Sequence, residues 1–254
     1  MHARGQVAHL DLPPDPRLTE GWPVVAPPGP GEDPRPALHP DSPMPPVPDT
    51  TNELLEDLRS GGTDALLRRL NGSLPHDIRV RSVVMAHPDF DARFCGLSRT
   101  YTYRIADRPS ALDPLRRHDT LHWPRPLELE PLIEASAQLV GLHDFAAFCK
   151  RREGATTVRA LLRLDWVRDD AGVLVATVEA DAFCHSMVRS LMGALIAVGE
   201  GRQPATWPGS LLTMTARSSG VLVAPPQGLT LERVDYPPDN ELAARQRITR
   251  NPRA

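Results

Sequence analysis

Alternating or β-branched residues along the chain predict β-strands, and apolar residues at helical spacing predict helices. The predicted strands span residues 4–12, 78–80, 83–85, 100–105, 157–168, 173–180 and 229–235. The predicted helices span residues 52–70, 128–140, 183–199 and 207–218. Strands and helices are therefore interspersed along most of the chain, and no internal repeat is visible.

Turn residues mark the ends of these segments. Gly61 and Gly62 interrupt the pattern of the first predicted helix and predict a break there. The sequence Asp-Asp-Ala-Gly at 169–172 lies between two strand-like runs and predicts a hairpin. Gly199 predicts the C-terminal end of a strongly apolar, buried helix. The chain after Tyr236 is polar, and we expect a frayed tail there.

Composition changes sharply between residues 13 and 48, which contain half of the 28 prolines of the chain. Proline removes backbone donors and fixes φ, so this stretch is expected to build neither helix nor sheet. We interpret residues 13–51 as a disordered insertion on the surface, with polyproline-like character. The alternative interpretation is a docking segment for a proline-recognising domain.

Charge is distributed unevenly along the 254 residues, a length that suits one large α/β domain or two small ones. Residues 11–57 carry ten acidic and two basic side chains, whereas the remainder carries 27 basic and 22 acidic ones. The net charge of −3 therefore conceals a modestly basic body. Such a body is compatible with phosphate binding.

Cysteine usage and apolar runs exclude several classes of protein. Cys95, Cys149 and Cys184 are far apart and form no C-x-x-C pair, so we expect reduced thiols, without a disulfide or a zinc site. No apolar run approaches the roughly 20 residues that span a bilayer, and no secretory signal is visible. Neither glycine-rich nucleotide motif is present. We therefore expect a cytoplasmic protein without a nucleotide cofactor.

Two groups of residues are candidates for chemistry. Arg99, Tyr101 and Tyr103 share one face of a predicted strand, because side chains two apart point the same way. An arginine beside two aromatic rings can hold a phosphate and stack a base, although an ordinary half-buried strand has the same pattern. Arg189 lies in an otherwise apolar helix and needs a partner. A salt bridge to a structural carboxylate is one interpretation of this arginine.

Other catalytic groups are not favoured by the spacing. Cys184 and His185 are neighbours, and neighbouring residues on a helix do not face one another, so a Cys/His nucleophile is not expected. His2 and His9 are seven residues apart in a predicted strand and therefore face opposite sides. We expect no metal there.

Several blocks of sequence resemble the tRNA pseudouridine synthase A family. The first nine residues, M-H-A-R-G-Q-V-A-H, are similar to the end of the family segment G-R-T-D-A-G-V-H-A-x-G-Q-V-x-H. Further blocks resemble the family's L-N-x-x-L-P-x-D-I-x-V up to residue 80, F-H-A-R-F at 90–94, R-x-Y-x-Y at 99–103, G-x-H-D-F-x-x-F at 141–148, A-F-x-x-x-M-V-R-x-x-x-G at 182–193 and A-P-x-x-G-L-x-L at 224–231. The resemblance covers residues 1–10 and 66–237.

The resemblance places the family's nucleophilic aspartate three residues before Met1, so we expect the catalytic aspartate to be absent from this chain. Lys150 is the only lysine, and the arginine-rich composition suggests GC-rich coding. GTG is read as valine inside a gene and as methionine at a start. We therefore expect Met1 to be the family's internal valine and the reading frame to continue upstream; a true start is the alternative.

The resemblance also implies roles for individual residues. Tyr101 is expected to pack against the target uracil, Leu229 to form part of the uracil pocket, and Arg189 to pair with the aspartate and keep it ionised. The RNA-binding positions it implies are His2, Arg4, Arg93 and Arg99. Asp91 departs from the family's histidine, and an acid there is expected to weaken a nearby phosphate contact.

The fold that the resemblance implies is α+β. It is a mixed, mainly antiparallel sheet flanked by helices and built from two related halves, with the first strand and helix missing here. The expected organisation is a remnant of the N-terminal half at 1–12, the proline-rich insertion at 13–51, the rest of that half at 52–106, the C-terminal half at 107–237 and a polar tail at 238–254.

The function that the resemblance implies is isomerisation of uridine to pseudouridine at positions 38–40 of the tRNA anticodon stem-loop. The target nucleotide is flipped out, and the aspartate assists breakage of the C1′–N1 bond, either by attack on the sugar or through a glycal, before the uracil rejoins through C5. The family needs no cofactor and no metal, and it acts on tRNA as a homodimer. Without the aspartate we expect this chain to be inactive. A non-catalytic tRNA-binding protein and a decayed fragment are the alternatives.

Overall fold

The computed structural model describes residues 2–4, 6, 8, 50–150, 152 and 155–250. Almost all of the predicted proline-rich insertion lies outside these residues, as does most of the strand predicted at 4–12. No described helix is long and apolar enough to cross a membrane.

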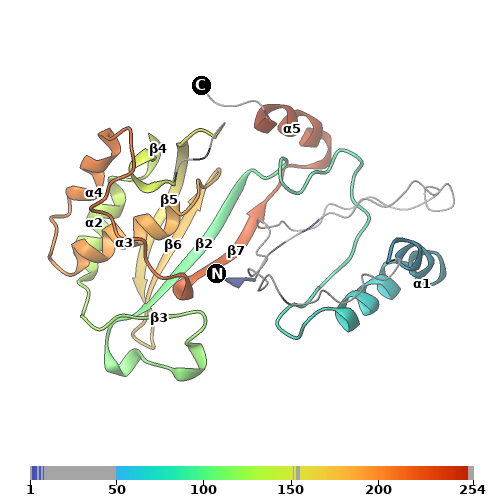
Figure 1. Ribbon diagram of the computed structural model, residues 1–254, viewed down its shortest axis with the longest axis horizontal. Helices are drawn as coiled ribbons and strands as arrows, with labels where there is room; N and C mark the ends of the chain where they lie inside the picture. The colour runs from blue at the N-terminus through green and yellow to red at the C-terminus, as the bar shows by residue number, and fades with distance from the viewer. Residues whose placement is uncertain are drawn as a thin grey trace, which may run out of the picture.

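One sheet of seven strands organises the described part of the chain (Figure 1). Its strands are β1 (His2–Ala3), β2 (Ser98–Ala106), β3 (Leu121–His122), β4 (Gly141–Asp144), β5 (Val158–Arg168), β6 (Leu174–Ala180) and β7 (Leu229–Asp235). The order is β1-β7-β2-β6-β5-β4, with β3 beside β2. The pairs β1–β7 and β2–β3 are parallel, and the remaining pairs are antiparallel. The predicted mixed, mainly antiparallel α+β sheet is therefore confirmed.

Helices and short 3-10 turns connect these strands. The helices are α1 (Thr50–Ser73), α2 (Leu129–Ala137), α3 (Met187–Gly199), α4 (Trp207–Ser210) and α5 (Leu242–Arg250). The 3-10 turns are η2 (Pro109–Ala111), η3 (Pro114–Arg116), η4 (Ala146–Phe148), η5 (Leu211–Thr213), η6 (Pro226–Gly228) and η7 (Asp239–Glu241). Figure 1 shows α2, α3 and α4 gathered on one side of the sheet.

The main core lies between one face of the sheet and helices α2 and α3. Every residue of α3 except Arg189 is buried, as expected for a helix that is apolar on all sides. Close packing of α3 depends on Gly193, because a Cβ atom there would lie 1.7 Å from the carbonyl oxygen of Leu222. Helix α3 therefore packs closely against the segment around Leu222, and its only residue that is not fully buried is the charged Arg189.

The best-patterned segments were predicted correctly. Strand β2 covers the predicted 100–105, and β5 and β6 form the predicted hairpin. In the turn of this hairpin, Gly172 has a φ of +80°, and the Asp169 carboxylate accepts hydrogen bonds from the backbone N–H groups of Ala171 and Val173. The break predicted at Gly61 and Gly62 is also present, because helix α1 is kinked at Gly62, whose φ of 64° and ψ of −159° are not helical. Local turn chemistry was sufficient to predict these features.

The strands predicted at 78–80 and 83–85 are wrong, because the structure has no strand in either range. The side-chain amide of Asn71 takes the place of a neighbouring strand. Its Nδ2 donates to the carbonyl oxygen of Val80 over 2.9 Å, and its Oδ1 accepts from Val80 N over 2.9 Å. The backbone of Val80 is thus satisfied by a side chain, without a sheet ladder. Of the strand predicted at 4–12, the described residues Arg4, Gln6 and Ala8 are not part of a strand, since β1 ends at Ala3. The other residues of that prediction lie outside the described part of the chain.

Three predicted helices are shorter in the structure than their patterns indicate. The helix predicted at 183–199 begins only at Met187, because Ser186 has a left-handed φ of 69° that no helix can continue through. In place of the helix predicted at 207–218, the structure has the short helix α4 followed by the 3-10 turn η5, which ends at Thr213. The chain then turns, and Ser218 N donates to Ala147 O over 3.0 Å. The helix predicted at 128–140 ends at Ala137. Tertiary contacts decided these boundaries.

The prediction of a frayed tail after Tyr236 is wrong as far as residue 250, because the chain forms η7 and α5 there. Leu242 is fully buried against Phe90 and Cys95 in a small second core. The ring of Tyr236 packs on Phe90 with 5.0 Å between centroids. A few apolar residues in a polar sequence were enough to anchor this helix, and composition alone did not reveal it.

Candidate active site

Strand β2 carries the predicted row of Arg99, Tyr101 and Tyr103. On β6 these residues pair with Ala180, Val178 and Ala176, which are all buried in the main core. The three side chains therefore share the face of the sheet that α3 covers, as the alternation predicted. Burial increases along the row, since Arg99 and Tyr101 are half-buried and Tyr103 is fully buried. The row is therefore open to solvent at the end that carries Arg99 and Tyr101.

The aromatic side chain that contacts Tyr101 is Phe183. The two rings meet edge to face, with 5.2 Å between centroids and 87° between planes. Such a contact fixes the orientation of the half-buried Tyr101 ring. The sequence pattern did not predict this contact, although Phe183 stands six residues before Arg189 in the A-F-x-x-x-M-V-R block.

Arg189 lies in the first turn of α3 and is bound to the segment that precedes β7. Its Nε donates to the carbonyl oxygen of Ala224 over 2.6 Å, and Ala224 N donates to the carbonyl oxygen of Arg189 over 2.9 Å. Within residues 2–4, 6, 8, 50–150, 152 and 155–250, no carboxylate forms an ion pair with Arg189. The structural carboxylate considered as an alternative partner is therefore not found in the described part of the chain.

Tyr103 is bound to the same segment as Arg189. Its hydroxyl donates to the carbonyl oxygen of Pro225 over 2.6 Å. Burial raises the pKa of Tyr103 well above its usual range, and the positive charge of Arg189 opposes this rise. The phenol is therefore protonated at neutral pH and donates permanently. Gly228 permits the close approach, because a Cβ atom there would lie 2.8 Å from the Tyr103 ring.

Leu229 and Tyr101 lie on the same face of the sheet but are not direct cross-strand partners. Leu229 pairs with Tyr103, whereas Tyr101 pairs with Leu231. Leu229 is 4% exposed and belongs to the main core, against which Tyr101 packs. Tyr101 and Leu229 are therefore diagonal neighbours on the face of the sheet that α3 covers.

The predicted RNA-binding arginines lie in two places. Arg99 donates from Nη1 to the carbonyl oxygen of Asp181 over 3.2 Å and from Nη2 to that of Arg93 over 3.3 Å. Arg93 is exposed and adjoins the end of β2. Arg4 lies at the other side of β7, where its Nη2 is 3.3 Å from the carboxylate of Asp119. The backbone of His2 pairs with Thr230, which puts β1 at the sheet edge.

Asp91 has backbone and side-chain partners that the sequence did not suggest. Its Oδ1 accepts from Arg93 N and Phe94 N over 2.8 and 2.9 Å, and its Oδ2 lies 3.2 Å from Nη2 of Arg250. The negative charge is therefore taken up by a turn and by the C-terminal helix. This arrangement accounts for an acid at a position where the family pattern has histidine.

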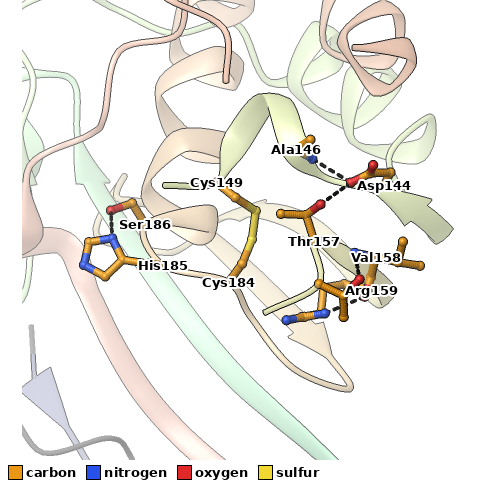
Figure 2. Close-up of a disulfide and its surroundings, with 10 residues drawn as sticks. Asp144, Ala146, Cys149, Thr157, Val158, Arg159, Cys184, His185 and Ser186 are labelled. Atoms are coloured by element: carbon orange, nitrogen blue, oxygen red, sulfur yellow. Dashed lines mark hydrogen bonds between the residues drawn. A yellow bond between two sulfur atoms is a disulfide. The ribbon is translucent and has the colours of Figure 1, made fainter. Parts of the chain in front are cut away.

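Cys149 and Cys184 form a disulfide beside the candidate site (Figure 2). Their Cα atoms are 5.7 Å apart, across 35 residues of sequence. The expectation that all three cysteines are free thiols is therefore wrong for this pair, because the fold brings together two residues that are distant in sequence. Lys150 N also donates to the carbonyl oxygen of His185 over 3.0 Å, next to the disulfide. Cys95 remains a free, fully buried thiol.

The side chain of Asp144 is bound within the fold. Its Oδ1 accepts from Ala146 N over 3.0 Å and from Thr157 Oγ1 over 2.6 Å, as Figure 2 shows. Phe145 and Phe148 are fully buried in the main core. These contacts hold the start of β5 against the turn that leads to Cys149.

Other kinds of site are not evident in the described residues. No group of His, Cys, Asp and Glu side chains is placed there to hold a metal ion. A surface hollow lies between α1 and the following segment, apart from the candidate site. Its lining residues are Leu67, Arg68, Asn71, Gly72, Arg79, Val80 and Arg81.

Comparison with known proteins identifies the family of this chain. The family model for tRNA pseudouridine synthase matches residues 135–237. A tRNA pseudouridine synthase A of Frankia casuarinae is 59% identical over 250 residues, covering 98% of this chain and 75% of the relative. A tRNA pseudouridine synthase A of Streptomyces griseus is 46% identical over 254 residues, covering 100% of this chain and 75% of the relative. A tRNA pseudouridine synthase A of Mycobacterium leprae is 51% identical over 189 residues, covering 74% of this chain and 66% of the relative. The chain therefore belongs to the tRNA pseudouridine synthase A family.

Proposed function

We propose that this protein isomerises uridine to pseudouridine in tRNA, at positions 38–40 of the anticodon stem-loop. The observation that carries the proposal is Arg189, the only incompletely buried residue of α3, beside the face of the sheet that presents Tyr101. Its relatives are named as tRNA pseudouridine synthases A. An arginine without a carboxylate partner among the described residues suits the role of holding a nucleophilic aspartate.

The proposed roles follow the geometry. Tyr101 packs against the flipped uracil, with its ring oriented by Phe183. Leu229 contributes the apolar side of the pocket from β7. Arg189 pairs with the aspartate, keeps it ionised and directs it at C1′ of the target nucleotide. The C1′–N1 bond breaks, the uracil turns, a C1′–C5 bond forms, and the proton at C5 is lost while N1 regains one.

We propose further that residues 1–254 by themselves do not turn over, because no described carboxylate lies against Arg189. The test compares two proteins in tritium release from tRNA labelled at C5 of uridine. One is the 254-residue chain. The other is a chimera in which any part of the Frankia casuarinae relative that precedes its match to this chain is placed before residue 1.

We expect background release from the first protein and multiple turnovers from the chimera. Robust turnover by residues 1–254 alone would mean that the nucleophile lies elsewhere in this chain. An inactive chimera that still binds tRNA would favour the alternative, a non-catalytic tRNA-binding protein. Binding of tRNA by both proteins is therefore measured in parallel.

We also propose a homodimer that acts in the cytoplasm. Two exposed apolar side chains near the β4 edge of the sheet support the dimer. Leu142 is 66% exposed and Leu162 52% exposed, and Leu142 pairs with Ala160, two residues before Leu162, where the register of β5 with β6 shifts. A second subunit would remove this apolar surface from water. Sedimentation velocity tests the proposal, and a monomer at tens of micromolar would contradict it.

A further inference from the structure

Helix α5 presents positive charge on a firmly anchored scaffold. It contains Arg245, Arg247 and Arg250 and no acidic residue. Arg245 donates from Nε and Nη2 to the carbonyl oxygen of Gly96 over 3.1 and 2.7 Å, and Gln246 donates to that of Asp89 over 2.6 Å. These bonds fix α5 on the loop at 89–97. Arg247 is exposed and has no hydrogen bond or ion pair with any described residue.

Two arginines meet at one aromatic ring on this surface. The guanidinium carbon of Arg93 lies 5.2 Å from the centroid of Phe94, and that of Arg250 lies 4.8 Å from it. The Asp91 carboxylate accepts two backbone amides and also lies 3.2 Å from Nη2 of Arg250, and the exposed Asp89 adds a second carboxylate to this loop. The loop at 89–97 and helix α5 together carry four arginines against two carboxylates, those of Asp89 and Asp91, so their net charge is positive. Such an arrangement favours an anionic partner.

The surface is continuous with the candidate active site. Arg99 bridges the two, since its guanidinium donates both to Arg93 O and to Asp181 O. Asp181 is two residues before Phe183, whose ring contacts Tyr101. A nucleic-acid strand leaving the Tyr101 pocket along Arg99 would therefore meet Arg93 and α5. Figure 1 shows α5 beyond the ends of β2 and β7, on the side where β2 begins.

We propose that Arg93, Arg247 and Arg250 bind the phosphate backbone of the substrate tRNA next to the flipped uridine. The C-terminal helix is thus part of the RNA-binding surface. The inference rests on the proposed function. Guanidinium groups match phosphate in geometry and charge, and three of them in one exposed patch suit successive phosphates of a strand.

The test measures equilibrium binding of a tRNA transcript to the 254-residue chain at several salt concentrations. The key variant is Arg247→Gln, because Arg247 holds no structural contact within the described residues and its loss should leave folding intact. Arg163→Gln is the matched control, because Arg163 is an exposed arginine of β5 that pairs with the nearby Asp165. Thermal unfolding checks that both variants are folded.

We expect Arg247→Gln to weaken binding several-fold and to lower the slope of log K against log salt by about 0.7–0.9, the loss of about one phosphate contact. Adding Arg93→Gln should lower the slope again by a similar amount. Arg163→Gln should bind like the unaltered chain. Equal affinities and slopes for Arg247→Gln and Arg163→Gln would overturn the inference while leaving the proposed function standing. Failure of the unaltered chain to bind tRNA would overturn both.

Discussion

Arg189 and Ala224 hold each other through two hydrogen bonds, one from the Arg189 guanidinium to Ala224 O over 2.6 Å and one from Ala224 N back to Arg189 O over 2.9 Å. The pair joins the first turn of α3 to the segment that leads into β7. It therefore fixes the guanidinium between the two elements that carry the rest of the candidate site. A side chain anchored in this way through Nε has its remaining nitrogens available for a carboxylate.

Arg189→Ala in the active chimera is expected to impair chemistry more than tRNA binding. A charge-assisted pair contributes about 1.5–3 kcal/mol, so the single-turnover rate should fall by about one to two orders of magnitude. The measurement is single-turnover kinetics at saturating enzyme, together with binding affinity. The contrasting variant is Arg99→Ala, which should mainly lower affinity and its salt dependence. A hundredfold loss of affinity with an unchanged single-turnover rate in Arg189→Ala would make Arg189 an RNA contact.

Gly193→Ala is expected to destabilise the protein strongly. A Cβ atom at this position would lie 1.7 Å from Leu222 O, so the chain that leads to Ala224 must shift away from α3. We expect a loss of at least about 2 kcal/mol in the free energy of unfolding, measured by urea denaturation. Gly72→Ala is the matched control, because nothing lies within 4 Å of its added Cβ. That variant should gain about 0.4–1 kcal/mol, and equal effects of both substitutions would refute the packing argument.

Asp107 is expected to make folding dependent on acid pH. Its side chain is fully buried, and it binds Arg168 over 2.7 Å and Leu127 N over 2.8 Å. Burial alone would raise the pKa of Asp107, but the bonds from Arg168 and Leu127 outweigh it and hold the pKa below the usual 3.8. Because the pKa of Asp107 is lower in the folded state than in the unfolded state, the ionised carboxylate stabilises the fold at pH values above the unfolded-state pKa. This contribution is lost as the pH falls below about 4 and through the folded pKa.

Asp107→Asn therefore should cost about 3 kcal/mol at pH 7, because it leaves the partly buried charge of Arg168 without its carboxylate. The difference from the unaltered protein should shrink as the pH falls below about 4. Urea denaturation at pH 7, 5, 4 and 3 measures both effects. A difference that stays constant over this range would show that Asp107 is not the titrating group.

Reduction of the Cys149–Cys184 disulfide is expected to lower stability by about 2–4 kcal/mol, because the bond closes a loop across 35 residues. Urea denaturation with and without dithiothreitol gives the value. The double variant Cys149→Ser, Cys184→Ser should be insensitive to the reductant. Mass spectrometry of the alkylated protein should count one free thiol, that of Cys95. Three alkylated cysteines in the untreated protein would exclude the bond.

The sequence by itself determined the elements whose patterns are local. The alternation in β2 predicted that Arg99, Tyr101 and Tyr103 share a face, and the residues around Gly172 predicted the β5–β6 hairpin. The motif blocks, in their order and spacing, were specific enough to indicate the family. Side-chain direction along a strand and turn conformation depend on residues a few positions apart, so a single sequence is enough for them.

Only the tertiary structure decided the features that join distant residues. The partnership of Arg189 with Ala224, the disulfide of Cys149 with Cys184 and the anchoring of α5 by Arg245 on Gly96 each join segments that are far apart in sequence. The loop held by Asn71 has the composition of a strand but lacks a neighbouring strand. No periodicity records such contacts, because their free energy comes from groups that meet only after the chain has folded.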